Sequence, residues 1–264
     1  MIAETAMYLS LMLSQNKYLA ETAKLIERLD KDGYKEIVEL VKDPQFRLFD
    51  PNPLRKKYNK IDLTNPKEHR YMRNESTQDS INFMEKRKEW LDEAEKLFPG
   101  IKREYITAVL NVESLFGKNK GDCPILNAVM SNYVFTERKD LFYEYTTEFL
   151  KFVREKGITD VFALKGSFTG ASTPAQLMPT SLRKYSYDLD GDGFEPDGIE
   201  DAIGSCANML WKKGGRKDIM KALRAYNGEK YARAVDMHAQ KVRQKLASPL
   251  ARKPPVVRKI PQKV

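Results

Sequence analysis

Apolar side chains recur at helical spacing through most of this chain. Between residues 102 and 116, Tyr105, Ala108, Val109 and Val112 fall on one face of a helix, as expected for a segment that packs against a core. Runs of alternating β-branched residues are scarce, so the pattern predicts a mainly α fold with little β structure. Similar stripes predict helices over residues 5–30, 34–42, 76–97, 138–156, 174–185, 199–213, 217–226 and 229–246.

Proline and glycine divide these segments into three regions. Four prolines punctuate residues 43–66, which favours an extended connector. We therefore expect an N-terminal helical segment with its connector over residues 1–75 and a helical domain over 76–246. Residues 247–264 are basic and proline-rich, so we expect them to be extended or disordered.

Charge restricts the choice of partner. The 264 residues include 46 Lys and Arg against 37 Asp and Glu, a net charge of +9 that favours an anionic partner. Basic residues are scattered among acidic ones, which argues against a nucleic-acid groove, and a run such as Arg55-Lys56-Lys57 is more typical of a solvated surface. No stretch is apolar over the roughly 20 residues that span a bilayer. The start, with Glu4 and no basic leader, is a poor signal peptide.

The few cysteines and histidines carry no metal-binding spacing. Cys123 and Cys206 could form a disulfide in an oxidising compartment or remain as two buried thiols, and the sequence leaves both open. His69 and His238 are isolated, and we assign neither a role.

An acidic loop at residues 188–201 resembles an EF-hand. Asp188, Asp190 and Asp192 occupy alternate positions before Gly193, the arrangement by which oxygen ligands converge on Ca²⁺. The usual glutamate at the twelfth position is replaced by Ile199, so a later acid must close the site. The alternative is an acidic turn without a metal, and a bound cation is expected to be structural. The expected ligands are Asp188, Asp190, Asp192, the carbonyl of Phe194, and Asp201 or its neighbour Glu200.

Glu113 is the candidate acid. It lies beside Val112, Leu115 and Phe116, near a helix end that Gly117 terminates, and both apolar surroundings and the helix C-terminus disfavour an ionised carboxylate. Such a glutamate can protonate the leaving oxygen of a glycoside, although most glutamates in such places are solvated or salt-bridged. No second acid accompanies it in a recognisable motif, whereas glycosidases ordinarily pair two carboxylates. This points to a reaction in which the substrate supplies the nucleophile.

Five segments together resemble a known family over roughly residues 55–240. The chain resembles the bacterial lytic murein transglycosylases of the membrane-bound B type, within the lysozyme-like superfamily. The matching segments, in order, are Val112 to Gly117, Leu164 to Ala171, Gln176 to Ser181, the acidic loop continuing into Asp201 to Asn208, and Arg224 to Asn227.

The resemblance implies a lysozyme-like helical core that cleaves peptidoglycan. In this family the β-1,4 bond between N-acetylmuramic acid and N-acetylglucosamine is broken without water, which leaves a 1,6-anhydromuramic end. Glu113 matches the single catalytic acid, first protonating the glycosidic oxygen and then acting as base on the muramic 6-hydroxyl. The substrate implies a periplasmic or envelope location. We expect a monomer with a structural Ca²⁺ or Na⁺, no organic cofactor, no nucleic-acid partner, and contact with other cell-wall enzymes.

Further positions carry over from the same resemblance. Ser167 and Gln176 match polar residues of the substrate groove, and Arg138 matches one arginine of a basic pair whose other position is Glu137 here. The acids of the 188–201 loop match the family's cation loop. Tyr226 and Asn227 match the tyrosine–asparagine pair that ends the family's series of motifs. Tyr231 matches a later tyrosine of the substrate groove.

Three departures keep two alternatives open. The loop before Gln176 reads Ser172-Thr173-Pro174-Ala175 in place of a glycine-containing segment, which stiffens the groove wall and affects sugar binding. A small β-rich insertion between Trp211 and Arg224 is missing, and the cation loop is about one residue short. The alternatives are a hydrolytic muramidase and a catalytically inactive peptidoglycan-binding scaffold.

Overall fold

Helices dominate the chain, as the sequence predicts. The computed structural model describes residues 18–58 and 74–248. Within them a single pair of very short antiparallel strands is found, β1 (Cys123–Pro124) and β2 (Lys165–Gly166). The helices are α2 (Leu19–Lys31), α3 (Ile37–Leu40), α4 (Asn52–Tyr58), α5 (Asn74–Lys86), α6 (Lys88–Leu97), α7 (Arg103–Ser114), α8 (Ile125–Phe135), α9 (Lys139–Glu155), α10 (Pro179–Tyr185), α11 (Ile199–Lys212) and α12 (Ile219–Ala247).

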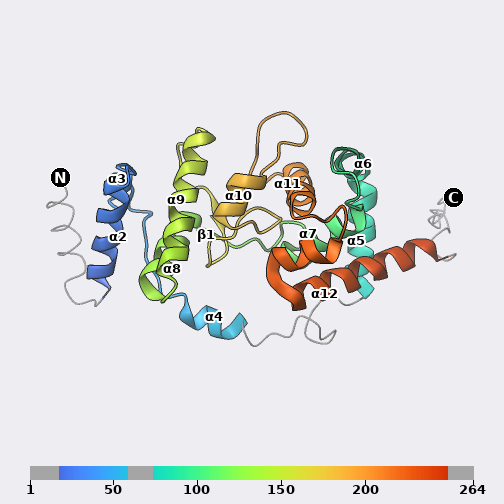
Figure 1. The fold of residues 1–264 in the computed structure, drawn as a ribbon, viewed down its shortest axis with the longest axis horizontal. Coiled ribbons are helices and arrows are strands. Elements are labelled where there is room, and N and C mark those ends of the chain that lie inside the picture. Colours follow the sequence, from blue (N-terminus) through green and yellow to red (C-terminus); the bar gives the residue numbers. More distant parts are fainter. Residues whose placement is uncertain (1–17, 59–73, 249–264) are drawn as a thin grey trace, which may run out of the picture.

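Helix α7 lies at the centre of the fold. It packs against α5, α11 and α12, while α8 and α9 form a second group that carries α10 (Figure 1). Ala108 and Val109 of its predicted stripe are fully inaccessible, because they face this three-sided contact, while Tyr105 and Val112 are half-buried. The two groups meet around the short strands, where the loops between helices converge.

Several boundaries differ from those predicted. Helix α8 was not predicted at all. The expected helix over 76–97 is broken at Arg87, whose φ of −111° and ψ of 25° separate α5 from α6. The helix expected from Pro174 begins instead at Pro179, which takes the first helical position that proline tolerates. The expected helix over 5–30 is described only from Leu19 onward.

The connector over 43–66 is partly helical, which corrects the extended conformation predicted for it. Its middle forms α4, and the segment leading to α4 is held along α8. The Phe49 N–H donates to Ser131 Oγ at 3.0 Å, and Asn127 Nδ2 donates to the Gln45 carbonyl at 2.9 Å. Residues 59–66 of the predicted connector, His69, and the tail from residue 249 lie outside the described residues.

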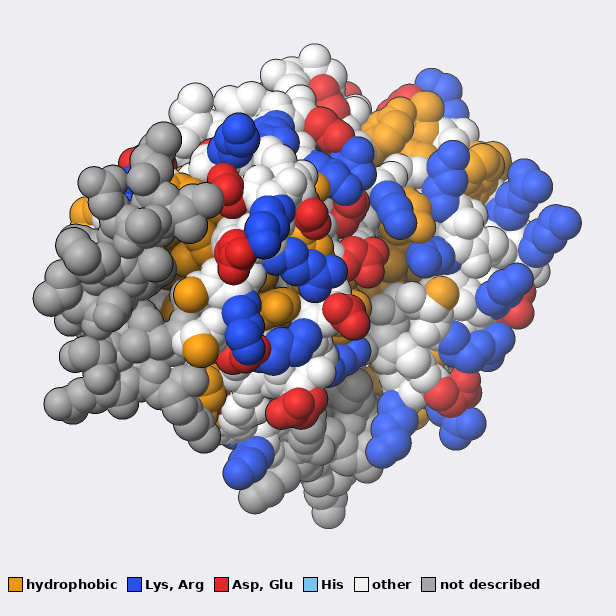
Figure 2. All heavy atoms as spheres, turned by 60° about the vertical axis from the view of Figure 1, so that its left-hand side comes forward, with side chains coloured by type: hydrophobic (Ala, Val, Ile, Leu, Met, Phe, Trp, Pro, Cys, Tyr) orange, Lys and Arg blue, Asp and Glu red, His pale blue; other side chains and the backbone are white. Residues whose placement is uncertain are grey.

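Helix α2 docks on α9 through mixed polar and aromatic contacts. The Arg28 guanidinium lies 3.6 Å from the centroid of the Tyr143 ring, and Lys139 Nζ lies 2.9 Å from a Glu21 carboxylate oxygen. Figure 2 shows this side of the molecule, where Lys and Arg side chains are mixed with Asp and Glu, as the sequence predicts. Among the described residues, no helix is both long and apolar enough to cross a bilayer.

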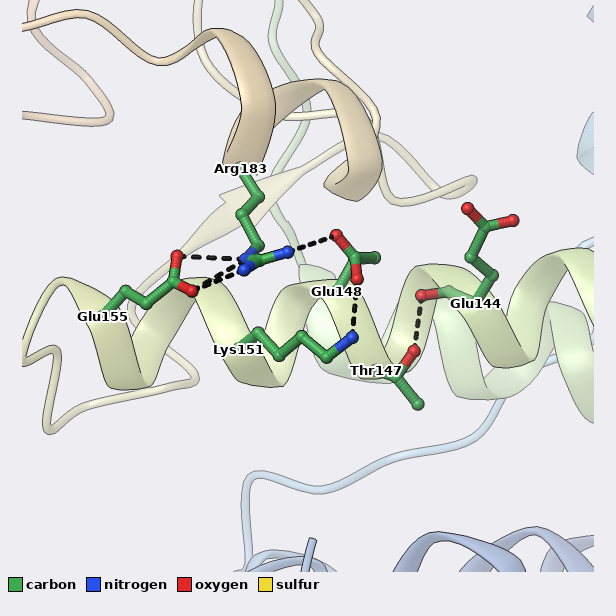
Figure 3. A network of polar contacts seen from close by, with 6 residues as sticks. All are labelled: Glu144, Thr147, Glu148, Lys151, Glu155 and Arg183. Atoms are coloured by element: carbon green, nitrogen blue, oxygen red, sulfur yellow. Dashed lines mark hydrogen bonds and ion pairs between the residues drawn. The ribbon is translucent and has the colours of Figure 1, made fainter. Parts of the chain in front are cut away.

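An ion-pair network fixes α10 on α9. Arg183 of α10 lies 3.0 Å from a Glu148 oxygen and 2.7 Å from a Glu155 oxygen, and Glu148 also pairs with Lys151 at 2.8 Å (Figure 3). The Glu148 side chain is only 11% exposed, so breaking the network would leave a poorly solvated charge. This network supports the wall of the site described next.

A second polar network joins α5, α7 and α12 beneath that site. The Asn111 amide donates to Ser80 Oγ at 2.8 Å, and Ser80 Oγ lies 2.9 Å from Nε2 of His238. All three side chains are buried, so these contacts fix the register of α7 two residues before Glu113.

Candidate active site

Glu113 lies in the last turn of α7, where the helix ends abruptly. Leu115 and Phe116 adopt left-handed conformations with φ of 51° and 58°, and Gly117 follows at 88°. The Phe116 N–H bonds the Leu110 carbonyl at 2.9 Å, the long-range bond of a helix C-terminal cap. Two consecutive non-glycine residues at positive φ are strained, and such strain is typical of functional sites.

Ser114 locks this helix end to the next loop. Its hydroxyl donates to the Pro174 carbonyl at 2.6 Å and accepts the Gly117 N–H at 2.8 Å. The residue directly after Glu113 is therefore tied to the loop at residues 172–175, one of the three expected departures from the family pattern. The backbone around the carboxylate is held from both sides.

A pocket of about 780 Å³ opens onto the Glu113 carboxyl. Its walls come from the loop after α7, the β2 turn, the start of α10 and a kink in α12, where Asn227 and Gly228 depart from helical backbone angles. Two apolar residues of the N-terminal segment complete it. The lining residues are Phe49, Leu54, Glu113, Asn119, Lys120, Gly121, Asp122, Cys123, Gly166, Ser167, Phe168, Thr169, Ala171, Gln176, Leu177, Met178, Ser181, Met209, Tyr226 and Asn227.

Burial raises the pKa of Glu113 from an ordinary value near 4.5 to about 7. The Tyr231 hydroxyl opposes this rise, because its proximity favours the ionised carboxylate. That hydroxyl is buried and makes no hydrogen bond of ordinary geometry with the described residues. At neutral pH the carboxyl is thus divided between its protonated and ionised forms, as suits a group that first donates and then accepts a proton.

The structure brings most of the predicted groove residues together. Ser167, Gln176, Tyr226 and Asn227 all line the pocket with Glu113. Tyr231 does not line it but stacks behind Tyr226, with ring centroids 5.6 Å apart.

Three of these side chains are held by local hydrogen bonds. Ser167 Oγ accepts the Ala171 N–H at 3.1 Å, and Gln176 Nε2 donates to the Lys120 carbonyl at 3.0 Å. The Tyr226 hydroxyl donates to the Ala175 carbonyl. The pocket wall is therefore largely preformed.

Arg138 lies apart from the pocket lining. It is an exposed residue that caps the start of α9, and its backbone N–H donates to Thr136 Oγ1 at 3.3 Å. The sequence reasoning also missed lining residues, among them Asp122, a second carboxylate that is exposed at the pocket. Asp122 is not among the causes of the Glu113 pKa shift, because burial raises that pKa and the Tyr231 hydroxyl opposes the rise.

Both cysteines are free thiols, so the disulfide alternative is not realised. Cys206 is fully buried, while Cys123 is half-buried in the pocket wall. Burial, together with the Asp122 carboxylate, raises the pKa of Cys123 to about 11, which keeps this thiol protonated near neutral pH.

The acidic loop gathers three carboxylates before α11. Oxygens of Asp188, Asp190 and Asp201 lie within 4.8 Å of one another. Asp201 is only 2% exposed, and both of its oxygens accept backbone N–H groups, from Leu189 at 2.9 Å and Glu195 at 2.6 Å. Burial, with the charges of Asp190 and Asp188, raises the pKa of Asp201. Three oxygen ligands so close together fit a hard cation, which would offset this repulsion.

The other two predicted ligands take different places. Asp192 is outside the group of three, although its contact with Asp190 raises its pKa. The Phe194 ring packs edge-on against Phe152 of α9 with centroids 5.9 Å apart. This packing fixes the loop to the α9 group.

Similar solved structures define the class of fold. The chain superimposes on soluble lytic transglycosylase SltB1 of Pseudomonas aeruginosa with a TM-score of 0.73 and 21% identity, over 86% of this chain and 99% of that one. For the Escherichia coli lytic transglycosylase SLT35, solved in complex with calcium, the TM-score is 0.71 at 18% identity, over 85% and 93% of the two chains. The fold is therefore the lysozyme-like helical fold of lytic transglycosylases.

The sequence comparison identifies the family. Residues 49–257 match the family described as transglycosylase SLT domain, and the chain belongs to this family. It is also 31% identical to membrane-bound lytic murein transglycosylase B of Escherichia coli over 155 residues. That match covers 55% of this chain and 42% of the relative, so it spans about two fifths of the relative's length.

Proposed function

We propose that this protein is a peptidoglycan lytic transglycosylase that cleaves the β-1,4 bond between N-acetylmuramic acid and N-acetylglucosamine. The observation that carries the proposal is Glu113, whose pKa near 7 belongs to a carboxyl opening onto a preformed pocket. Family membership and the similarity to a murein transglycosylase support the choice of substrate.

Glu113 acts first as an acid and then as a base. Its proton passes to the glycosidic oxygen as the bond to the anomeric carbon breaks. The resulting carboxylate removes a proton from the muramic 6-hydroxyl, whose oxygen then bonds to the anomeric carbon and closes the 1,6-anhydro ring. The neighbouring Tyr231 hydroxyl favours the intermediate carboxylate, which supports the proton donation of the first half.

The acidic loop serves structure in this proposal. Asp188, Asp190 and Asp201 would hold a Ca²⁺ or Na⁺ ion, and Ca²⁺ is the ion present in the similar SLT35 structure. The ion would neutralise the three carboxylates and stabilise the loop. A periplasmic or envelope location and a monomeric state follow as proposals from the substrate class.

Product analysis tests the reaction. Purified peptidoglycan is digested, and the released muropeptides are examined by mass spectrometry. Anhydro ends, lighter by one water than reducing ends, are expected from the wild type and are lost with Glu113→Gln. Reducing ends would instead indicate a hydrolytic muramidase, for which Asp122 is the available second carboxylate in the pocket. Binding without release would identify an inactive scaffold.

A further inference from the structure

Helix α12 meets the end of α7 through two buried side chains. Tyr231 and His238 both follow the kink of α12, and seven positions separate them (238 against 231), nearly two helical turns. They therefore project from the same face of the helix, roughly 10 Å apart along its axis. Tyr231 contacts Glu113 of α7, while Nε2 of His238 lies 3.4 Å from the side-chain nitrogen of Asn111, on the same helix.

The contact at His238 ends a directed chain of hydrogen bonds. The Asn111 amide nitrogen donates to the Ser76 carbonyl at 3.1 Å and to Ser80 Oγ at 2.8 Å. Because Ser80 Oγ accepts that proton, its own proton is available for Nε2 of His238, 2.9 Å away. Nε2 therefore acts as an acceptor, which is the state of a neutral imidazole. This chain joins α5, α7 and α12.

Asn111 carries this anchoring to the turn that holds the acid. Its carbonyl accepts the Leu115 N–H at 2.9 Å, so Asn111 and Glu113 belong to the same last turn of α7. Asn111 is only 1% exposed, and both atoms of its amide are hydrogen-bonded, to Ser76 and to Ser80. Sliding this turn along α12 would therefore break a buried and satisfied network, which is unfavourable.

The Tyr231 hydroxyl has no comparable anchor of its own. It is buried and makes no hydrogen bond of ordinary geometry with the described residues, although it lies close enough to lower the pKa of Glu113. Stacking on Tyr226 supports its ring but supplies no partner for the hydroxyl. Tyr226 and Cys206 also face the carboxyl, and neither is among the causes of its pKa shift. The place of the hydroxyl thus depends on how α12 lies against α7.

We propose that His238 is a positioning residue, which fixes α12 against α7 at Asn111 and so holds the Tyr231 hydroxyl beside Glu113. The inference rests on the proposed function, in which Glu113 is the acid. His238 is absent from the pocket lining, so it acts through the two helices and not on the substrate. A histidine to which the sequence assigns no role would then set the proton affinity of the acid.

The first test measures the pKa of Glu113 without substrate, by NMR titration of its carboxyl carbon, with Glu113→Gln identifying the resonance. His238→Leu removes the acceptor and should raise this pKa by about 0.5–1, the value of one hydrogen bond. His238→Gln, whose Oε1 accepts in place of Nε2, should restore the wild-type pKa. A lower unfolding midpoint in His238→Leu with an unchanged pKa would make His238 an ordinary core residue and overturn the proposal.

A matched control removes another contact between the same helices. The Tyr105 hydroxyl donates to Asp236 Oδ1 at 2.8 Å, and Tyr105 lies eight positions before Glu113 (113 against 105), two turns from the acid. Both side chains are half-buried, so water replaces this bond more readily than one inside the buried network. Tyr105→Phe should therefore leave the pKa of Glu113 unchanged, and a shift equal to that of His238→Leu would overturn the assignment.

Double variants separate an effect through Tyr231 from a general loosening of the site. Once Tyr231→Phe has removed the hydroxyl, His238→Leu should add nothing to the pKa of Glu113, and additive shifts would overturn the proposal. Ser80→Ala is a smaller change that breaks the same chain at its middle, and it keeps the test open if His238→Leu does not fold. It should raise the pKa in the same direction, again without additivity to Tyr231→Phe, and no shift would count against the proposal.

Kinetics on purified peptidoglycan give the functional readout. His238→Leu should lower kcat about fivefold and leave KM within about twofold of wild type, because the acid changes and the pocket lining does not. A raised KM with unchanged kcat would overturn the positioning role. Failure of the wild type to cleave peptidoglycan, with the pKa shifts retained, would count against the proposed function alone.

Discussion

Replacing Glu113 with glutamine should stabilise the folded protein at alkaline pH. Burial raises the pKa of this carboxyl from about 4.5 to about 7, so the folded state resists its ionisation. Between these values the unfolded chain has released the proton and the folded chain still holds it. Wild-type stability therefore falls as pH rises from about 4.5 to about 7. Each tenfold change in proton affinity is worth about 1.4 kcal/mol, which places the full loss at about 3 kcal/mol.

The measurement is urea denaturation of both proteins across pH. Below pH 4.5 their free energies of unfolding should differ by a constant small amount, since the carboxyl is neutral in both states. Above pH 8, Glu113→Gln should be more stable than wild type by an additional 2–3 kcal/mol, about the whole of the lost stability. Titration of all other groups cancels in the difference. Glu85→Gln, an exposed change on α5, should show no such trend, and a pH-independent Glu113→Gln difference would refute the assignment of a buried acid.

Three further outcomes are expected. Tyr231→Phe removes the hydroxyl that lowers the pKa of Glu113, so the alkaline limb of the kcat–pH profile should move to higher pH, and a shift to lower pH would contradict this. Gly121 has a φ of +91°, and Gly121→Ala would place a Cβ 2.2 Å from a carbonyl oxygen of β2, so the free energy of unfolding should fall by about 3 kcal/mol. Gly157 also has a positive φ but open space around it, so Gly157→Ala should lower the free energy of unfolding by only about 1 kcal/mol. Calcium at a hundred times its Kd should add about 2.7 kcal/mol in thermal unfolding; Asp190→Asn should abolish this gain, and an equal gain in the variant would exclude the loop as the site.

The end of α7 was predictable because its signals are local. An apolar stripe, an acid beside it and Gly117 after it define a helix terminus without tertiary information. The left-handed Leu115 and Phe116 and the Tyr231 hydroxyl beside the acid depend on packing between distant segments. The place of Glu113 and the direction of its pKa shift could therefore be predicted from the sequence, but the Tyr231 contact that opposes the shift could not.

Helix α8 shows why periodicity fails in a core. Every residue from Ile125 to Val134 is buried, so the segment has no polar face from which a helical period could be recognised. The same burial makes it the support against which the N-terminal segment and the β2 turn are held.

Helix α4 was missed although it has a start signal. The proline spacing suggested a connector, but Pro53 stands in the first turn of the helix, where proline is tolerated. Asp50 accepts the Asn52 N–H through its side chain at 2.9 Å, as a capping residue does. Reading Asp-Pro-Asn-Pro as a helix start would have placed Leu54 and Arg55 on an ordered element. Only the tertiary structure places them beside the pocket.

The loop at residues 172–175, expected to depart from the family pattern, is joined directly to the residue that follows the acid. Thr173 and Gln176 adopt positive φ values of 67° and 51°, so the missing glycine is replaced by strained residues. Hydrogen bonds offset that strain. Ser114 binds the Pro174 carbonyl, Tyr226 binds the Ala175 carbonyl, and Ser172 exchanges two backbone bonds with Leu177 at 3.0 and 2.8 Å.

These bonds change what the substitution of this loop implies. A stiff wall was expected to alter sugar binding, and that expectation stays a prediction. Because the same wall anchors Ser114, its rigidity also restrains the carboxyl of Glu113, the preceding residue. A flexible glycine loop would leave that restraint to the substrate. Under the proposed function, the position of Glu113 would be set before a glycan binds, and the loop sequence would contribute to preorganisation of the proposed acid.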